Sequence, residues 1–122
     1  MTPFGQSLEK IRRDRGLKQF ELADLIDIKA SYVSVLERGH KGPPSKFIIR
    51  KIIEKLQLTE EEKQTLLHDA EISAYTFTIP YGISRSEFEL LHQLKNELGS
   101  LNENQILIMK TVLSMRIERE RA

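Results

Sequence analysis

The chain of 122 residues contains no cysteine, which excludes disulfides, thiolate nucleophiles and cysteine-ligated zinc sites. Its three histidines, His40, His68 and His92, are widely separated and form neither a His-Glu-x-x-His motif nor a group with paired acidic ligands. Each is more simply a surface or partly buried residue of a helix. We therefore expect no catalytic residue, no metal site and no cofactor, and a protein that is not an enzyme.

Long hydrophobic stretches are also missing. No apolar run approaches the length of a membrane span, and the first residues lack the hydrophobic region of a signal peptide. Gly42 precedes two prolines and has no phosphate-binding glycine pattern around it. The sequence therefore predicts a soluble, cytoplasmic protein without a membrane partner.

Charge is present but unevenly divided. Residues 1–58 contain 12 Lys and Arg against 7 Asp and Glu, a surplus of +5, whereas residues 59–122 contain 7 against 11, a balance of −4. Arg12, Arg13, Arg15, Lys41 and Lys46 add to the basic supply of the first half. Such an asymmetry fits a nucleic-acid-binding half joined to a half with another task.

Two short helices joined by a tight turn are predicted between residues 19 and 38. The first, about residues 19–26, places Leu22, Leu25 and Ile26 on one face, and Asp tolerates the left-handed backbone that a turn at Asp27 requires. The second runs from about residue 30 to residue 38 and stops at Gly39, a usual residue just past a helix end. This is the pattern of a helix-turn-helix, which makes DNA the expected ligand.

The second helix has two different sides. At about 100° per residue, Val33 and Leu36 form a buried edge, while Ser31, Ser34, Val35 and Arg38 lie on the opposite side. In a recognition helix that outer side enters the major groove of DNA. The alternative is a helical hairpin inside an ordinary bundle, whose outer face is merely solvated.

Residues 4–70 resemble the lambda-repressor-like family of helix-turn-helix regulators, also called the xenobiotic-response-element family. The resemblance is carried by residues 19–23, 31–34 and 36–39, and by a loop at residues 42–45. It implies that Gln19 contacts a phosphate and that positions 29, 30, 31, 34 and 35 face base edges or flanking phosphates. The family often has Gly where this chain has Asp27, and favours Ser or Thr where Lys18 and Lys29 stand.

Lys18 and Lys29 stand at the predicted starts of the two helices. Lysine offers no acceptor there, losing a cap usually worth about 1 kcal/mol, and its charge opposes the helix dipole. Beside a DNA phosphate that charge becomes favourable, so we expect both lysines to contact the phosphate backbone of DNA. The alternative is that both point into water and other groups cap the helices. The predicted DNA-binding residues are Lys18, Gln19, Lys29, Ala30, Ser31, Tyr32, Ser34, Val35, Arg38 and Lys41.

Further helices complete an all-α domain of five helices over residues 1–74. Thr2 and Ser45 are predicted helix caps, and Thr59 with Glu62 is a capping box. Residues 75–83 alternate apolar and polar side chains, which predicts an extended linker or short strand, lying against the domain as a strap or pairing with a second copy.

Residues 84–122 are predicted to form an antiparallel helical hairpin, opened by a capping box at Ser84 and Glu87. Its apolar coverage is too wide for two helices to bury between them, so we expect a twofold homodimer here. The predicted dimerisation residues are Phe88, Leu91, Leu94, Leu98, Ile106, Met109, Val112 and Leu113.

The sequence therefore predicts a dimeric, sequence-specific regulator of transcription that binds a pseudo-twofold double-stranded DNA operator, most simply as a repressor. One alternative is an antitoxin-type protein that binds a partner protein through its C-terminal helices and also represses its own operon. Another is a scaffold that never contacts DNA.

Overall fold

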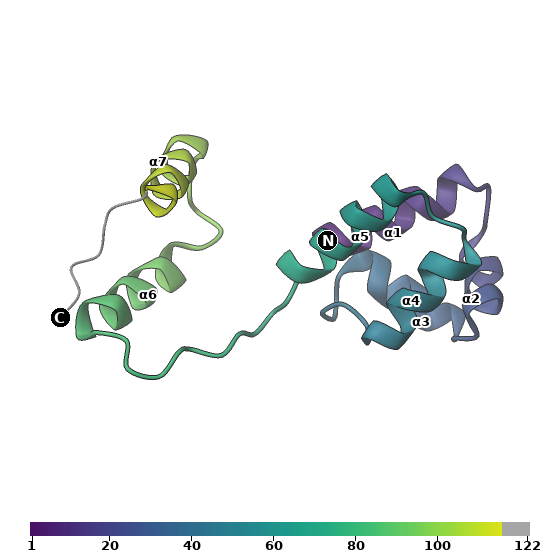
Figure 1. Ribbon diagram of the computed structural model, residues 1–122, viewed down its shortest axis with the longest axis horizontal. Helices are drawn as coiled ribbons and strands as arrows, with labels where there is room; N and C mark the ends of the chain where they lie inside the picture. Colours follow the sequence, from purple (N-terminus) through teal and green to yellow (C-terminus); the bar gives the residue numbers. More distant parts are fainter. Residues whose placement is uncertain (116–122) are drawn as a thin grey trace. The chain divides into compact units, whose positions relative to one another are not determined.

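The computed structural model describes residues 1–115, and in this range the chain forms seven helices and no strand (Figure 1). The helices are α1 (Pro3–Asp14), α2 (Gln19–Ile26), α3 (Ala30–Arg38), α4 (Lys46–Lys55), α5 (Glu60–Ile72), α6 (Arg85–Glu97) and α7 (Glu103–Ser114). The predicted all-α class is confirmed. Residues 75–83 do not pair into a strand, because hydrogen bonding along a strand needs a neighbouring strand that the described chain does not supply.

The chain divides into two compact units, Met1–Phe77 and Thr78–Ala122. In the first unit α1 packs against α3 and α5, and α2 packs against α3 and α4. Leu25, whose spacing placed it on one helix face with Leu22 and Ile26, is exposed. The buried apolar side chains are those of Phe4, Leu8, Ile11, Leu22, Ala23, Ile26, Val33, Leu36, Ile49, Ile52, Leu56, Leu66 and Ala70.

Helices α1 and α3 cross at Gly5. A Cβ atom at this position would lie 2.5 Å from the carbonyl oxygen of Glu37 and 2.6 Å from that of Leu36, both of which are backbone atoms that cannot yield. Glycine is therefore required here for the close approach of two backbones. The recognition-helix candidate α3 is thus held directly against α1.

Most helices begin at a residue whose side chain accepts a backbone N–H. The predicted caps Thr2 and Ser45 accept from Gly5 and Ile48. The predicted capping boxes at residues 59 and 62 and at residues 84 and 87 are also present, and a further box joins residues 102 and 105. These bonds satisfy N–H groups that have no partner inside their own helix.

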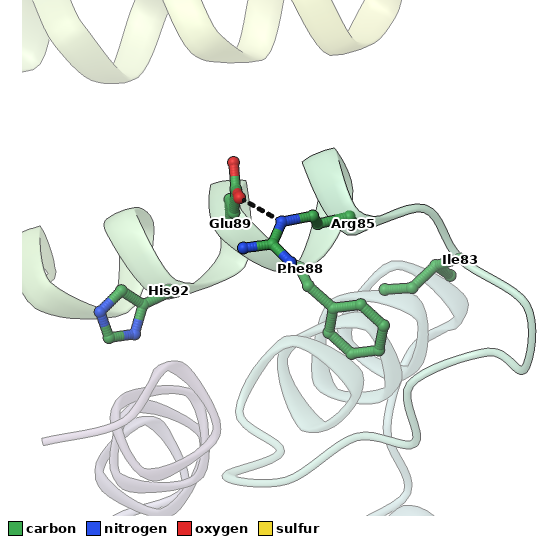
Figure 2. A pocket seen from close by; sticks show the side chains of 5 residues that line it. All are labelled: Ile83, Arg85, Phe88, Glu89 and His92. Atoms are coloured by element: carbon green, nitrogen blue, oxygen red, sulfur yellow. Dashed lines mark hydrogen bonds and ion pairs between the residues drawn. The ribbon is translucent and has the colours of Figure 1, made fainter.

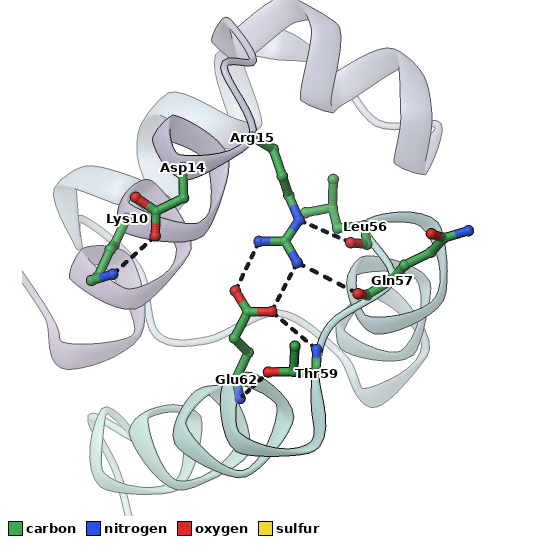
Figure 3. Close-up of polar contacts among 7 residues, drawn as sticks. All are labelled: Lys10, Asp14, Arg15, Leu56, Gln57, Thr59 and Glu62. Atoms are coloured by element: carbon green, nitrogen blue, oxygen red, sulfur yellow. Dashed lines mark hydrogen bonds and ion pairs between the residues drawn. The ribbon is translucent and has the colours of Figure 1, made fainter.

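Arg15 joins three helix ends in the first unit (Figure 3). Its guanidinium donates to both carboxylate oxygens of Glu62 at 2.8 Å, and its Nε donates to the carbonyl of Leu56 at 2.9 Å. Glu62 also accepts the backbone N–H of Thr59 at 3.0 Å. Hydrogen bonds from Arg15 and Thr59 hold the pKa of Glu62 at about 2, below its ordinary value of 4.5. One carboxylate therefore caps α5 and ties it to α1.

The second unit is built differently, because neither α6 nor α7 has a buried residue. Of the predicted dimerisation residues, Phe88, Leu98, Val112 and Leu113 are exposed, and Leu91, Leu94, Ile106 and Met109 are partly exposed. The packing of α6 and α7 as a closed hairpin, and its use in dimerisation, stay predictions.

Candidate nucleic-acid interface

The turn between α2 and α3 has the backbone that a helix-turn-helix requires. Asp27 is left-handed, with φ of 59° and ψ of 49°, and the N–H of Ile28 donates to the carbonyl of Ala23 at 3.0 Å. This hydrogen bond closes the end of α2, and α3 begins two residues after Ile28. The prediction of a left-handed turn residue at Asp27 is confirmed.

Helix α3 has the two sides that its sequence predicts. Val33 and Leu36 are buried, Ala30, Ser31 and Arg38 are exposed, and Ser34 and Val35 lie between these extremes. Tyr32, also predicted to meet DNA, is half-buried and packs against the core. The outer side of α3 therefore carries small side chains and one guanidinium.

Glu37 is an acidic residue of α3 that sequence reasoning overlooked. Its side chain is buried and accepts from Arg12 of α1 through two bonds, 2.7 Å from Nε and 2.9 Å from Nη2. The third nitrogen of Arg12 donates to the carbonyl of Leu17 at 2.8 Å. Hydrogen bonding to Glu37 raises the pKa of Arg12 above its ordinary value. The pair ties α3 to α1 and to the chain just before α2.

Gln19, the predicted phosphate contact, belongs to this same network. Its amide nitrogen donates to Glu37 at 3.1 Å, so the side chain is held at the first turn of α2. A side chain that is already ordered loses less conformational entropy when it binds. The network therefore fixes the first turn of α2 and helix α3 relative to each other before a ligand binds.

Three arginines counted in the basic supply of the first half have acidic partners. Arg12, Arg13 and Arg15 each form an ion pair with a glutamate, at positions 37, 9 and 62 respectively. The clue in the sequence is positional. Arg12 follows Leu8 by four residues and Glu37 follows Val33 by four, so each extends the apolar face of its helix. These positions direct both side chains toward the core, but only the structure shows that they pair with each other.

Several basic side chains of the first unit have no ion-pair partner among residues 1–115. They belong to the start of α2, both ends of α3, the following loop and α4: Lys18, Lys29, Arg38, Lys41, Lys46 and Arg50. All six are exposed. Arg50 was not predicted as a DNA contact, because no local feature of the sequence distinguishes it from the arginines that form ion pairs. Lys51, Lys55 and Lys63 also lack an ion pair among the described residues, so most, though not all, of these cations belong to the helix-turn-helix, the following loop and α4.

Lys18 and Lys29 occupy the N-cap positions of α2 and α3, as predicted, and neither supplies a capping hydrogen bond. For α2 the carboxylate of Glu21 takes over part of that task, accepting the N–H of Lys18 at 2.9 Å. The first turn of α3 contains no acidic residue. The positive end of α3 is therefore available to an anion such as a phosphate.

Outside this surface, a shallow pocket in the second unit is lined by Ile83, Arg85, Phe88, Glu89 and His92 (Figure 2). Arg85 and Glu89 pair with each other at 2.9 Å across one turn of α6. Within residues 1–115 no cluster of histidine and acidic residues is suited to a metal ion, and no helix is long and apolar enough to span a membrane.

The fold, the left-handed turn and the two-sided α3 define a helix-turn-helix DNA-binding domain. A model of the helix-turn-helix family matches residues 8–63. An uncharacterized HTH-type transcriptional regulator of Bacillus subtilis (strain 168), RghRB, is 36% identical over 61 residues, which are 50% of this chain and 44% of that protein. These matches confirm, for the N-terminal unit, the predicted resemblance to the lambda-repressor-like helix-turn-helix regulators. The chain spans less than half the length of this relative.

Proposed function

We propose that the chain is a dimeric regulator of transcription, acting as a repressor at a pseudo-twofold operator in double-stranded DNA. One observation carries the proposal. The outer side of α3 is accessible, and most cations of the first unit that lack an ion pair within residues 1–115 belong to the helix-turn-helix, the loop after it and α4. Phosphates bound by those cations would orient α3, and its side chains would read base edges.

The reading side chains limit what the operator can be. Ala30 and Val35 suit the methyl groups of thymine, whereas Ser31 and Ser34 hydrogen-bond to several bases. The outer side of α3 offers no Asn, Gln or Glu for a bidentate contact. We expect half-sites containing T and A with few strongly fixed positions, centred about 34 Å apart or at a multiple of that distance.

Selection of bound sequences from a random DNA pool tests the proposal. The parent should select a consensus, and Val35→Gln should shift it, because an amide prefers adenine where a methyl group meets thymine. Ile72→Gln, at an exposed site on α5, is the matched control and should keep the parent consensus. An unmoved consensus in Val35→Gln would show that α3 does not read the bases at this position.

The two N-cap lysines test phosphate binding separately from base reading. Lys18→Thr and Lys29→Ser should each reduce the magnitude of the negative slope of log affinity against log salt by about 0.9 per lost contact in each subunit. Lys10→Ser is the control, because the Lys10 ammonium lies 2.9 Å from Asp14 and is already compensated. The lysine assignment fails if both variants keep the parent's slope.

Dimerisation through α6 and α7 is supported by the apolar side chains that these helices expose. A second copy covering them would bring two α3 helices to one operator. Sedimentation of the full chain should report a dimer, and a fragment of residues 1–77 should be monomeric and bind DNA far more weakly. A fragment that stayed dimeric with full affinity would exclude this role for the second unit.

A second candidate function rests on the same exposed apolar side chains. If a different protein covers α6 and α7, the chain would act like an antitoxin that binds its partner and represses its own operon. Co-purification of a tightly bound second protein in fixed proportion would favour this candidate. A DNA footprint from the chain alone would favour the dimeric regulator.

A further inference from the structure

Three segments far apart in the sequence are joined in the first unit, around the end of α3. The buried hydroxyl of Ser73, just after α5, accepts the N–H of Phe4 at 2.9 Å and donates to the carbonyl of Asp69. Two residues further on, the hydroxyl of Tyr75 donates to the carbonyl of Gly39. The exit from α5 is thus bonded both to the start of α1 and to the end of α3.

The peptide group between Gly39 and His40 is held from both sides. Its N–H, from His40, donates to the carbonyl of Val35 at 3.3 Å, the bond that ends α3, and its carbonyl accepts from Tyr75. Gly39 has φ of 74°, and a Cβ there would lie 2.6 Å from the backbone nitrogen of Thr2. Rotation of this peptide group would therefore break hydrogen bonds on both of its sides.

We propose that Tyr75 is a positioning residue that fixes this peptide group and so sets the direction of the loop that carries Lys41. The inference rests on the proposed function, in which Lys41 contacts a DNA phosphate. It also assigns Tyr75 of the linker to the DNA-binding unit. Any partner or second copy that pulls the linker away would release the loop next to the recognition helix.

The surroundings of Tyr75 support a role for its hydroxyl rather than its ring. Tyr75 is 61% exposed, so burial of the ring contributes little to folding. Tyr81, in the same linker, is fully exposed and has no hydrogen bond to the described residues. These two tyrosines therefore form a matched pair, of which only Tyr75 has a bonded hydroxyl.

Hydrogen exchange of the His40 amide, measured by NMR in the full chain without DNA, tests the bond itself. In Tyr75→Phe the amide should exchange about two- to tenfold faster, as expected for loss of one neutral hydrogen bond. Tyr81→Phe should exchange like the parent. Unchanged exchange at His40 in Tyr75→Phe would overturn the inference, whatever the protein binds.

Binding to the selected operator tests the consequence. Tyr75→Phe should bind about two- to fivefold more weakly, with the consensus unchanged and a smaller salt slope, whereas Tyr81→Phe should match the parent. Parent-like affinity and salt slope in Tyr75→Phe would overturn the positioning role. A parent chain that selects no DNA sequence would overturn the proposed function instead, a result separate from the exchange measurement.

Discussion

Residues 1–77 and residues 78–115 are both helical, yet only the first unit encloses a core. Its buried apolar side chains come from all five helices, whereas α6 and α7 bury none. The two capping boxes at the starts of α5 and α6 are alike in sequence and in bonding. Caps therefore decide where a helix begins in either unit, but they do not supply the packing that stabilises short helices in water.

A second difference lies in the ion pairs of the two units, Arg15 with Glu62 in the first and Arg85 with Glu89 in α6. Glu62 of α5 also receives the guanidinium of Arg15, so it acts between helices. Ion pairing in α6 joins Arg85 to Glu89 within one helix, at exposed positions. Long-range polar contacts accompany a core, because a core fixes the distances between side chains from different helices.

The largest expected effect comes from breaking the buried pair of the first unit. Glu37→Ala leaves the Arg12 guanidinium buried without its carboxylate, which should cost about 3–5 kcal/mol of unfolding free energy. Urea denaturation measures this at one fixed protein concentration. Glu89→Ala, which removes the exposed partner of Arg85, should leave stability nearly unchanged. Similar losses in both variants would contradict the distinction between the units.

Truncation of leucines compares the two units by packing alone. Leu22→Ala opens a cavity in the core and should cost about 2–5 kcal/mol. Leu113→Ala removes a side chain that is 81% exposed, so the dilute monomer should be as stable as the parent. Its effect should instead appear in sedimentation as a weaker dimer. A large loss in the dilute monomer would show that α7 is packed within one chain.

The charge of Glu62 should make the stability of the first unit depend on pH. The folded-state pKa of Glu62 is about 2, so its contribution is fully present above pH 5 and is lost as the pH falls toward 2. Partial exposure screens the pair, and we expect about 1–2 kcal/mol. Thermal unfolding of Glu62→Gln should therefore differ from the parent at pH 7 and converge with it near pH 2.

Glu87→Gln is the matched control, because Glu87 holds the same place in the box of α6. It should not change the pH dependence of unfolding of the first unit. A Glu62→Gln variant whose deficit persisted unchanged down to pH 2 would show that the charge of Glu62 is not what stabilises the fold.

The smallest effect concerns the turn before α3. Asp27→Gly relieves the left-handed backbone of a residue with a Cβ and should change stability by between about 0 and +1 kcal/mol. Asp24→Gly, three residues earlier in α2, should instead lose about 0.5–1 kcal/mol, because glycine weakens a helix interior. Urea denaturation of both variants checks the opposite signs, and equal losses would show that the turn carries no strain.

Much of the fold could be predicted because its determinants lie within a few residues of one another. The ranges predicted for the two helices of the motif, residues 19–26 and 30–38, agree with the structure. Thr2, Ser45 and Asp27 were also placed correctly, since a cap or a left-handed turn depends on the residue and its immediate neighbours. The outer side of α3 followed from helical periodicity in the same way.

The candidate site was less predictable where it depends on distant partners. Sequence alone could not show that Arg12 is paired while Arg38 is not, because the Arg12–Glu37 pair joins residues 25 positions apart. Gln57 is left-handed, with φ of 48°, although glutamine has no preference for this backbone. Arg15 contacts the carbonyl of Leu56 there, a bond that exists only once α1 has packed.

By itself, then, the sequence determined the helices, their caps, the turn and the two sides of α3, because these follow from interactions along a single segment. Tertiary structure alone decided which charges are buried in pairs, which remain accessible to a phosphate, and why Gly5 lies at the crossing of α1 and α3. It also brought Tyr75 to the end of the recognition helix. Such contacts require the core to bring distant segments together, and no local pattern encodes that distance.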